Sequence, residues 1–360
     1  MIIMADISRL HSLSPNFKKR LSGITTTVVN LTPRINTLGF SSAVLGPSLP
    51  DYVNKISYTD IFKLSQKPKG ASHRVWHARR NTEMLFGIFL KSILRFPLKL
   101  VFTSASQKKL GWYKKWLLSH MDAVVATSEK TASYLPRHIS SHVIHHGVDT
   151  TRFHPFTKTQ DLWTKAALKT SLGLDPRQRY IGCFGRIRPL KGTDIFVDAC
   201  VSLLTQHPQW SALIVGRITR QNQSYAQKIQ QKIAEHNLSH RILFVDESTD
   251  IVSYYQCLDL FVAPQRYEGF GLTPLEAMAC GVPVVATDVG AYRELVHANC
   301  GSICETDALD MASYIETYIV DDLKRENASQ FARSYAVSCL DINNEAKSLI
   351  KLYSQLIQKG

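Results

Sequence analysis

Two glutamates within RYEGFGLTPLE, residues 266–276, are the side chains whose type and spacing point most directly to chemistry. Glu268 and Glu276 flank a Gly-Phe-Gly turn, and ionised carboxylates only accept hydrogen bonds, so the pair suits a hydroxyl-bearing ligand. Gly269 and Gly271 let the backbone approach that ligand, and the stretch that follows predicts a helix start whose N–H groups would bind an anion. The segment predicts a nucleotide-sugar site, although either glutamate alone would be an ordinary surface acid.

A second loop, GRIRPLKG, places Arg186 and Lys191 directly after the apolar run YIGCF. A guanidinium fork and an ammonium suit a diphosphate, and they would stabilise the charge that builds as a nucleoside diphosphate departs. The sequence contains no Asp-x-Asp, the usual handle for a divalent ion on a diphosphate. We therefore expect a reaction with no metal and no cofactor. The alternative is a solvated basic turn, since Arg188 makes the loop cationic in any case.

The first half of the chain offers weaker candidates. His77, in HRVWHARRN, follows an apolar strand and is expected to face the ligand from the opposite side, although an isolated histidine is more often a core or surface residue. Gly23, in KKRLSGITTT, would allow close backbone approach to a donor or acceptor. The three cations before it would bind an acceptor phosphate or simply be solvated; they are Lys18, Lys19 and Arg20.

Short apolar runs alternate with helical ones in the second half, from YIGCFG through SALIVG, ILFVDE and DLFVAP to PVVATD. This alternation predicts a parallel sheet covered by helices on both faces, a doubly wound α/β unit. Ligands of such sheets bind at the carboxyl ends of the strands, and both motif loops follow a strand. We therefore expect the two loops to meet.

The first half repeats this logic with SSAVLG, HRVWHA, LKLVFTSA, DAVVATS and SHVIHHGVD as strands and with helices near 24–35, 81–94 and 108–120. The opening segment ADISRLHSLSP is the least apolar of the expected strands. We expect two Rossmann-like lobes with a cleft between them, residues 1–160 and 161–341, and a last helix over 342–357 that packs back on the first lobe.

The charge is divided unevenly. Of 43 Lys+Arg and 29 Asp+Glu, residues 1–150 hold 21 and 7, which leaves 22 of each for the rest of the chain. A lobe so basic suits a polyanion, and composition alone leaves nucleic acid, an anionic bilayer and a phosphorylated acceptor open. Seven cysteines in expected strands and helices favour a reducing compartment, and neither a signal sequence nor a membrane span is evident. The expectation is a cytoplasmic protein.

GRIRPLKG, EGFGLTPLE with AMACGVPVVATDVGAYRELV after it, and HHGVD resemble the retaining glycosyltransferases of GT-B fold in the E-x7-E group, which is glycosyltransferase family 4-like. The first half, with PNFKKRLSGITTT, WHARRN and MDAVVATS, is similar to bacterial lipopolysaccharide core mannosyltransferases. The likeness spans nearly the whole chain.

The resemblance implies roles. Glu276 would bind the ribose, Arg186 and Lys191 the diphosphate, and His77 the sugar. The donor sugar and distal phosphate would lie on Glu268 and the amides of Gly269, Phe270 and Gly271, and Leu272 would add a donor contact. Glu294, in GAYRELV, matches a position often found near the donor, with a salt-bridged helix acid as the alternative. Mannose would pass from GDP-mannose to a lipid A-linked core oligosaccharide with retention, by front-face attack in which the departing phosphate helps to deprotonate the acceptor.

An anionic glycolipid acceptor would place the enzyme on the cytoplasmic face of the inner membrane. Lys91 and Arg95 at helical spacing and the segment KKLGWYKKWLL are expected to contact lipid, unless the tryptophans are core residues. A UDP- or ADP-sugar donor with another glycolipid or polysaccharide acceptor is one alternative. A basic nucleotide- or nucleic-acid-binding protein is another, but no zinc spacing, RNP-like strand or helix-turn-helix supports contact with nucleic acid.

Overall fold

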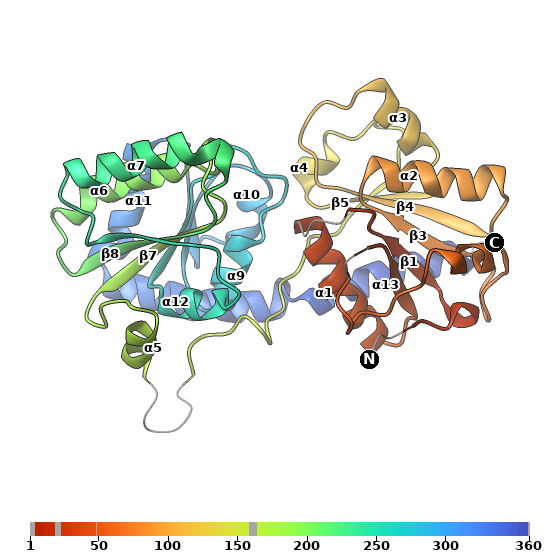
Figure 1. Ribbon diagram of the computed structural model, residues 1–360, viewed down its shortest axis with the longest axis horizontal. Helices are drawn as coiled ribbons and strands as arrows, with labels where there is room; N and C mark the ends of the chain where they lie inside the picture. The colour runs from red at the N-terminus through yellow and green to blue at the C-terminus, as the bar shows by residue number, and fades with distance from the viewer. Residues whose placement is uncertain (1–3, 19–22, 48, 158–163, 359–360) are drawn as a thin grey trace. The chain divides into compact units, whose positions relative to one another are not determined.

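The computed structural model describes residues 4–18, 23–47, 49–157 and 164–358. The chain folds into two compact units: unit 1 contains residues 1–147 and 342–360, and unit 2 contains residues 148–341. The boundary expected at residue 160 thus falls between Gly147 and Val148, because Val148 bonds to Leu340 at the end of unit 2. Each unit contains a six-stranded sheet in which every pairing is parallel (Figure 1).

Unit 1 has its strands in the order β2-β1-β3-β4-β5-β6. They are β1 (Ser12–Pro15), β2 (Ser42–Leu45), β3 (Arg74–Ala78), β4 (Leu98–Ser104), β5 (Ala123–Ala126) and β6 (Ser141–Val143). The helices are α1 (Gly23–Thr37), α2 (Asn81–Ile88), α3 (Trp112–Ser119), α4 (Glu129–Ala132) and α13 (Ile342–Gln358), with the 3-10 turns η1 (Ile7–Arg9) and η2 (Thr59–Ser65) and the π turn η3 (Phe89–Ile93).

Side chains of this sheet alternate between two helical layers, as the strand period of two requires. Trp76 and Leu100 face the cluster that includes Met84 of α2, whereas Val75 and Val101 face the cluster that includes residues of α13. The helix α13, blue in Figure 1, lies against α1, so the C-terminal segment completes the core of unit 1.

Unit 2 has the strand order β12-β11-β10-β7-β8-β9. The strands are β7 (Arg179–Phe184), β8 (Trp210–Val215), β9 (Ile242–Val245), β10 (Leu260–Ala263), β11 (Val284–Thr287) and β12 (Gly301–Cys304). The helices are α5 (Lys165–Ser171), α6 (Thr193–Leu204), α7 (Gln223–Glu235), α8 (Ile251–Cys257), α9 (Thr273–Ala279), α10 (Tyr292–Leu295), α11 (Ala308–Val320) and α12 (Asp322–Cys339), with 3-10 turns η4 (Pro189–Lys191) and η5 (Arg220–Asn222).

In both sheets the order in which the chain adds strands reverses at one point, and a ligand is expected at this point. In unit 2 the chain leaves β7 toward β8 and β9 and then returns to β10 on the other side of β7, the order of a Rossmann fold. In unit 1 the reversal lies between β1 and β3. Loops that leave neighbouring strands in opposite directions open a crevice at their carboxyl ends, where ligands of such folds bind.

The opening strand differs from its prediction. Only Ser12–Pro15 forms β1, and Ile7–Arg9 is a 3-10 turn capped by Asp6. Ser12 and Ser14 are buried all the same, since β1 is flanked by β2 and β3 and all its residues lie inside the sheet. The helix expected over 81–94 is likewise interrupted, because α2 gives way to a π turn at Phe89.

The covering role of α13 is testable. Leu349 is buried beside Val101 and Val125, and replacing a buried leucine with alanine costs about 2–5 kcal/mol. We expect Leu349→Ala to speed hydrogen exchange of the β3 and β4 amides, measured by mass spectrometry, and to leave β7 and β8 unchanged. Leu309→Ala, at an exposed position of α11, is the matched control. Unchanged exchange in β3 and β4 would contradict the packing.

Candidate active site

The two motif loops of unit 2 meet at the reversal of its sheet. GRIRPLKG leaves β7 and RYEGFG leaves β10, which is the neighbouring strand. Gly192 has a φ of 68°, and a Cβ added there would lie 1.8 Å from the carbonyl oxygen of Pro264. The backbones of the two loops are therefore in contact at a position where only glycine fits.

An arginine that the sequence pattern does not single out holds the loops together. The Arg266 backbone N–H donates to Leu190 O at 3.1 Å, and its Nη1 donates to Pro189 O at 2.8 Å. Its two Nη atoms also bind both carboxylate oxygens of Asp194 at 2.7 Å, a bidentate pair at the start of α6. Asp194 accepts a further bond from Tyr225 Oη at 2.7 Å. No sequence signal predicts these contacts, because their residues lie far apart in the chain.

The two cations proposed for a diphosphate differ in their surroundings. Lys191 forms an ion pair with Glu268, whose other oxygen accepts the N–H of Gly269 at 3.0 Å. Arg186 is exposed and has no side-chain partner among the described residues. Lys191 is thus held beside a carboxylate, whereas the guanidinium of Arg186 is exposed and could bind an anion.

Glu276 lies in the first turn of α9, where burial raises the pKa of its carboxyl group. Its Oε2 accepts a hydrogen bond from Tyr255 Oη at 2.8 Å, and Tyr255 is fully buried on α8. The Oε1 atom accepts no bond from the described residues, so one oxygen of a fixed carboxylate remains for a ligand hydroxyl. The sequence predicts Glu276 but carries no signal for Tyr255.

The turn between the two glutamates is shaped by packing. Gly271 has a φ of 94°, and a Cβ there would lie 2.1 Å from the ring of Tyr292. The Phe270 side chain is buried in the core, and Leu272 packs against the same cluster. Phe270 can therefore offer only backbone groups to a ligand, whereas the Leu272 side chain is partly exposed. Glu294 is partly buried on the short helix α10, after Tyr292.

His77 requires a correction. The pattern predicts that it faces the ligand, but the structure buries it completely, with Nδ1 bonded to Tyr353 Oη and Nε2 to Thr103 Oγ1 at 2.6 Å. The reason is strand alternation: His77 shares the face of Val75, which α13 covers. Both ring nitrogens are occupied, so His77 has no group with which to contact a sugar.

The remaining candidates lie in unit 1. Gly23 begins α1 with open space around a hypothetical Cβ, and Lys18 is exposed. Lys19 and Arg20 fall outside the described residues. Lys91 is paired with Asp122 at 2.6 Å, and Arg95 is exposed with a φ of 57°.

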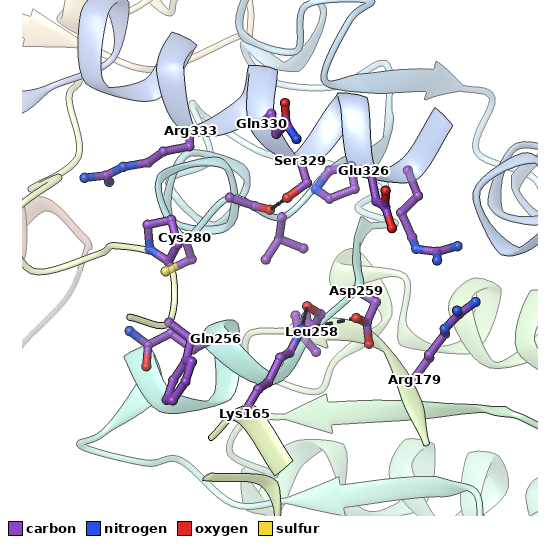
Figure 2. A pocket seen from close by; sticks show the side chains of 16 residues that line it. Lys165, Arg179, Gln256, Leu258, Asp259, Cys280, Glu326, Ser329, Gln330 and Arg333 are labelled. Atoms are coloured by element: carbon purple, nitrogen blue, oxygen red, sulfur yellow. Dashed lines mark hydrogen bonds and ion pairs between the residues drawn. The ribbon is translucent and has the colours of Figure 1, made fainter. Parts of the chain in front are cut away.

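A cavity of ≈ 760 Å³ lies at the other end of the unit 2 sheet, near the starts of β7 and β10 (Figure 2). Its four Lys and Arg side chains all have protein partners. Lys165 binds Asp259 at 3.1 Å; Arg179 and Arg325 bind Asp322; and Arg333 donates to backbone carbonyls, among them Ala279 O at 2.7 Å. These charges are already satisfied, so the carboxyl edge remains the candidate site.

Comparison with known proteins identifies the family. The family "Glycosyl transferases group 1" matches residues 164–335. The chain is 45% identical to "Lipopolysaccharide core biosynthesis mannosyltransferase LpsB" of Rhizobium meliloti (strain 1021), over 99% of this chain and 100% of that protein. It is 42% identical to "Lipopolysaccharide core biosynthesis mannosyltransferase LpcC" of Rhizobium leguminosarum bv. viciae, over 98% and 99%. The crystal structure of Anabaena HepE in complex with UDP has a similar fold, with a TM-score of 0.80 at 20% identity over 96% of this chain and 100% of that one.

The buried state of His77 predicts a pH effect. Burial, then the charge of Arg79, then His146 hold the pKa of His77 well below its usual value, so the folded protein keeps the ring neutral. The unfolded chain protonates it below about pH 6.5, which favours unfolding there. We expect this one group to lower the free energy of unfolding by about 1.4 kcal/mol between pH 7.5 and 5.5, and to have no effect at higher pH.

Urea unfolding at both pH values checks this expectation. In His77→Gln the loss of stability on acidification should be smaller than in the wild type by that amount. His138→Gln, at an exposed position of unit 1, controls for the removal of a histidine. An equal loss in the wild type and His77→Gln would contradict a neutral, buried ring.

Proposed function

The chain belongs to the group 1 glycosyl transferases, and we propose that it transfers mannose from GDP-mannose, with retention, to a lipopolysaccharide core oligosaccharide. It is a glycosyltransferase of GT-B fold. Two relatives that match it from end to end are named mannosyltransferases of lipopolysaccharide core biosynthesis, which supports this acceptor class. The observation that carries the donor site is the ion pair of Lys191 and Glu268 at the reversal of the unit 2 sheet, with the exposed Arg186 on the same loop as Lys191.

The open guanidinium of Arg186 is proposed to bind the diphosphate as a fork, and Lys191 to join it as a point charge. Binding would draw the Lys191 ammonium from the carboxylate toward the phosphate. Glu268 would then accept a hydrogen bond from a sugar hydroxyl, and Glu276, oriented by Tyr255, would accept one from the ribose.

The proposed reaction breaks the bond between the anomeric carbon and the β-phosphate oxygen and forms a bond from that carbon to an acceptor oxygen. The electron pair of the broken bond stays on the phosphate, so negative charge grows beside Arg186 and Lys191. Positioned cations that meet a developing charge lower the barrier more than they lower the energy of the bound substrate. The acceptor proton passes to the departing phosphate on the same face, so retention needs no protein nucleophile. We propose that the two cations serve without a metal.

Calorimetric titration tests the donor site. We expect GDP to bind without magnesium and more tightly than UDP or ADP. In Arg186→Ala the Kd for GDP should rise about 10- to 100-fold, since a hydrogen bond to a charged group contributes about 1.5–3 kcal/mol. The control is Arg177→Ala, an exposed arginine paired with Asp175 ahead of β7.

Tighter binding of UDP or ADP than of GDP would change the identity of the donor nucleotide but would leave the proposed binding site in place. Binding that requires magnesium would contradict the role of the two cations. An unchanged GDP affinity in Arg186→Ala would place the diphosphate elsewhere.

A glycolipid acceptor would be bound at a membrane, and the surface of unit 1 supports peripheral contact with an anionic membrane. Among the described residues no helix is long and apolar enough to span a bilayer. Helix α2 contacts both η3 and α3, and these elements nevertheless expose large apolar side chains: Ile93 is 66% exposed at the end of η3 and Trp112 is 82% exposed on α3. The set, which we call the aromatic–basic surface, is Leu85, Phe89, Ile93, Trp112 and Trp116 with the exposed cations Arg95, Lys109 and Lys115.

Two details refine this surface. Trp112 and Trp116 are exposed, so the alternative that they are core residues does not hold. Lys91 pairs with Asp122, so its charge is already neutralised within the protein. Apolar rings flanked by cations suit the boundary between headgroups and acyl chains of an anionic leaflet.

Co-sedimentation with phosphatidylcholine vesicles, with and without 30% phosphatidylglycerol, tests membrane contact. We expect the wild type to prefer the anionic vesicles, and Trp112→Ser/Trp116→Ser to bind them about 10-fold or more weakly, because each ring contributes buried apolar area. Tyr52→Ser, an exposed aromatic after the edge strand β2, should bind as the wild type does. Equal binding to both vesicle types, or no effect of the double substitution, would contradict the proposed membrane contact.

A further inference from the structure

Arg79, in the WHARRN segment, is a buried arginine that has no counter-ion among the residues that the structure describes. It is 8% exposed, and its only side-chain hydrogen bond within the described residues runs from Nη1 to Ser14 Oγ at 3.2 Å. Its Nε is buried and has no hydrogen-bond partner in the described part of the chain. The nearby carboxylate does not pair with it: Glu83 accepts the backbone N–H of Arg79 at 2.8 Å, but its ion pair at 2.7 Å is with Arg80.

An unpaired guanidinium in this place is unfavourable for the free protein. A guanidinium stays protonated in proteins, so it cannot relieve burial by losing its charge. Removing such an ion from water costs several kcal/mol unless an anion or enough hydrogen bonds compensate it. One neutral hydroxyl, Ser14, is a weak substitute for a carboxylate. An arriving oxyanion would supply the missing partner.

The position of Arg79 in the sheet marks it independently as a ligand position. Arg79 directly follows β3, and β3 and β1 are the two strands between which the unit 1 sheet reverses. Ligands of open parallel sheets bind at the carboxyl ends of the strands at such a reversal. Thr127, directly after β5 at the same edge, also has a buried hydroxyl that bonds to none of the described residues.

We propose that Arg79 binds an oxyanion of the glycosyl acceptor, a carboxylate of an acidic sugar or a phosphate ester. This inference rests on the proposed function, because the nucleotide is assigned to unit 2 and the anion at the unit 1 edge is therefore taken to be the acceptor's. The planar fork of a guanidinium matches both oxyanions with two parallel hydrogen bonds. Arg79 thereby selects acceptors that are anionic near the hydroxyl that reacts.

Thermal unfolding of the full chain tests the site without any donor. The probes are inorganic phosphate, galacturonate and neutral galactose, each compared with sodium chloride at equal ionic strength. We expect phosphate, galacturonate or both to raise the Tm of the wild type, and galactose not to do so. In Arg79→Gln that rise should shrink or disappear, and in chloride the variant should be at least as stable as the wild type, because an uncompensated buried charge is gone. Arg137→Gln, an exposed arginine in unit 1, should keep the wild-type response.

The two anion arms separate the possible sources. A response to galacturonate alone identifies a carboxylate site, and a response to phosphate alone identifies a phosphate site. Anion stabilisation that is equal in the wild type and Arg79→Gln would overturn the proposal, as would a wild type that responds to neither anion. An Arg79→Gln protein that is destabilised in chloride and responds to anions as the wild type does would make Arg79 a structural cation.

Kinetics and nucleotide titration keep this inference distinct from the proposed function. We expect Arg79→Gln to raise the KM for a core-glycolipid acceptor at least 10-fold, Arg79→Lys to restore part of the loss, and the GDP affinity of both variants to equal that of the wild type. An unchanged acceptor KM would overturn the role of Arg79. If the wild type binds no nucleotide, but the anion response of the wild type is lost in Arg79→Gln, the anion site stands and the transferase mechanism fails.

Discussion

The ion pair between Lys191 and Glu268 is the interaction on which the proposed donor site depends. It joins the loop after β7 to the loop after β10, and so places a cation and a carboxylate at the reversal of the unit 2 sheet. Arg266 fixes the same two loops through Asp194 and two backbone carbonyls. The pair holds Lys191 in position before a ligand arrives, and a diphosphate would exchange one anionic partner for another. Such preorganisation is what electrostatic catalysis requires, because the charges need not be rearranged as the bond breaks.

Two residues of one strand end show how the fold separates structural from functional polar groups. His77 and Arg79 are two positions apart and are both buried, yet His77 has a partner on each ring nitrogen and Arg79 has a single hydroxyl. Tyr353 of α13 satisfies the histidine, which therefore belongs to the core of unit 1. The arginine lies just beyond the strand, at the carboxyl edge of the sheet, where we propose that the acceptor's anion binds. Arg79, whose buried guanidinium has only that hydroxyl as a partner among the described residues, is therefore a better position to test than His77, which only its place in the sequence singled out.

Much of this architecture follows from local pattern. Continuous apolar runs alternating with amphipathic ones predict both parallel sheets, and the glycine-bounded loops after β7 and β10 predict where Glu268 and Arg186 lie. The contacts that orient these residues could not be predicted, because Arg266 with Asp194 and Tyr255 with Glu276 join side chains that only the tertiary fold brings together. The error at His77 has the same origin: an apolar strand with a terminal histidine does not reveal that a tyrosine 276 positions further along the chain covers that face. The short, serine-containing strand β1 is difficult to predict for the opposite reason. Its burial comes from the neighbouring strands, so its sequence carries no apolar pattern.

The most direct measurement is a crystal structure of the protein with GDP, grown without a divalent cation. We expect the β-phosphate to lie within hydrogen-bond distance of the Arg186 guanidinium and the Lys191 ammonium, the Lys191–Glu268 pair to be loosened, and a ribose hydroxyl to bind the Oε1 of Glu276. Density for the nucleotide in another place, such as the cavity of Figure 2, with Lys191 still bound to Glu268 and Glu276 contacted by Tyr255 alone, would contradict it.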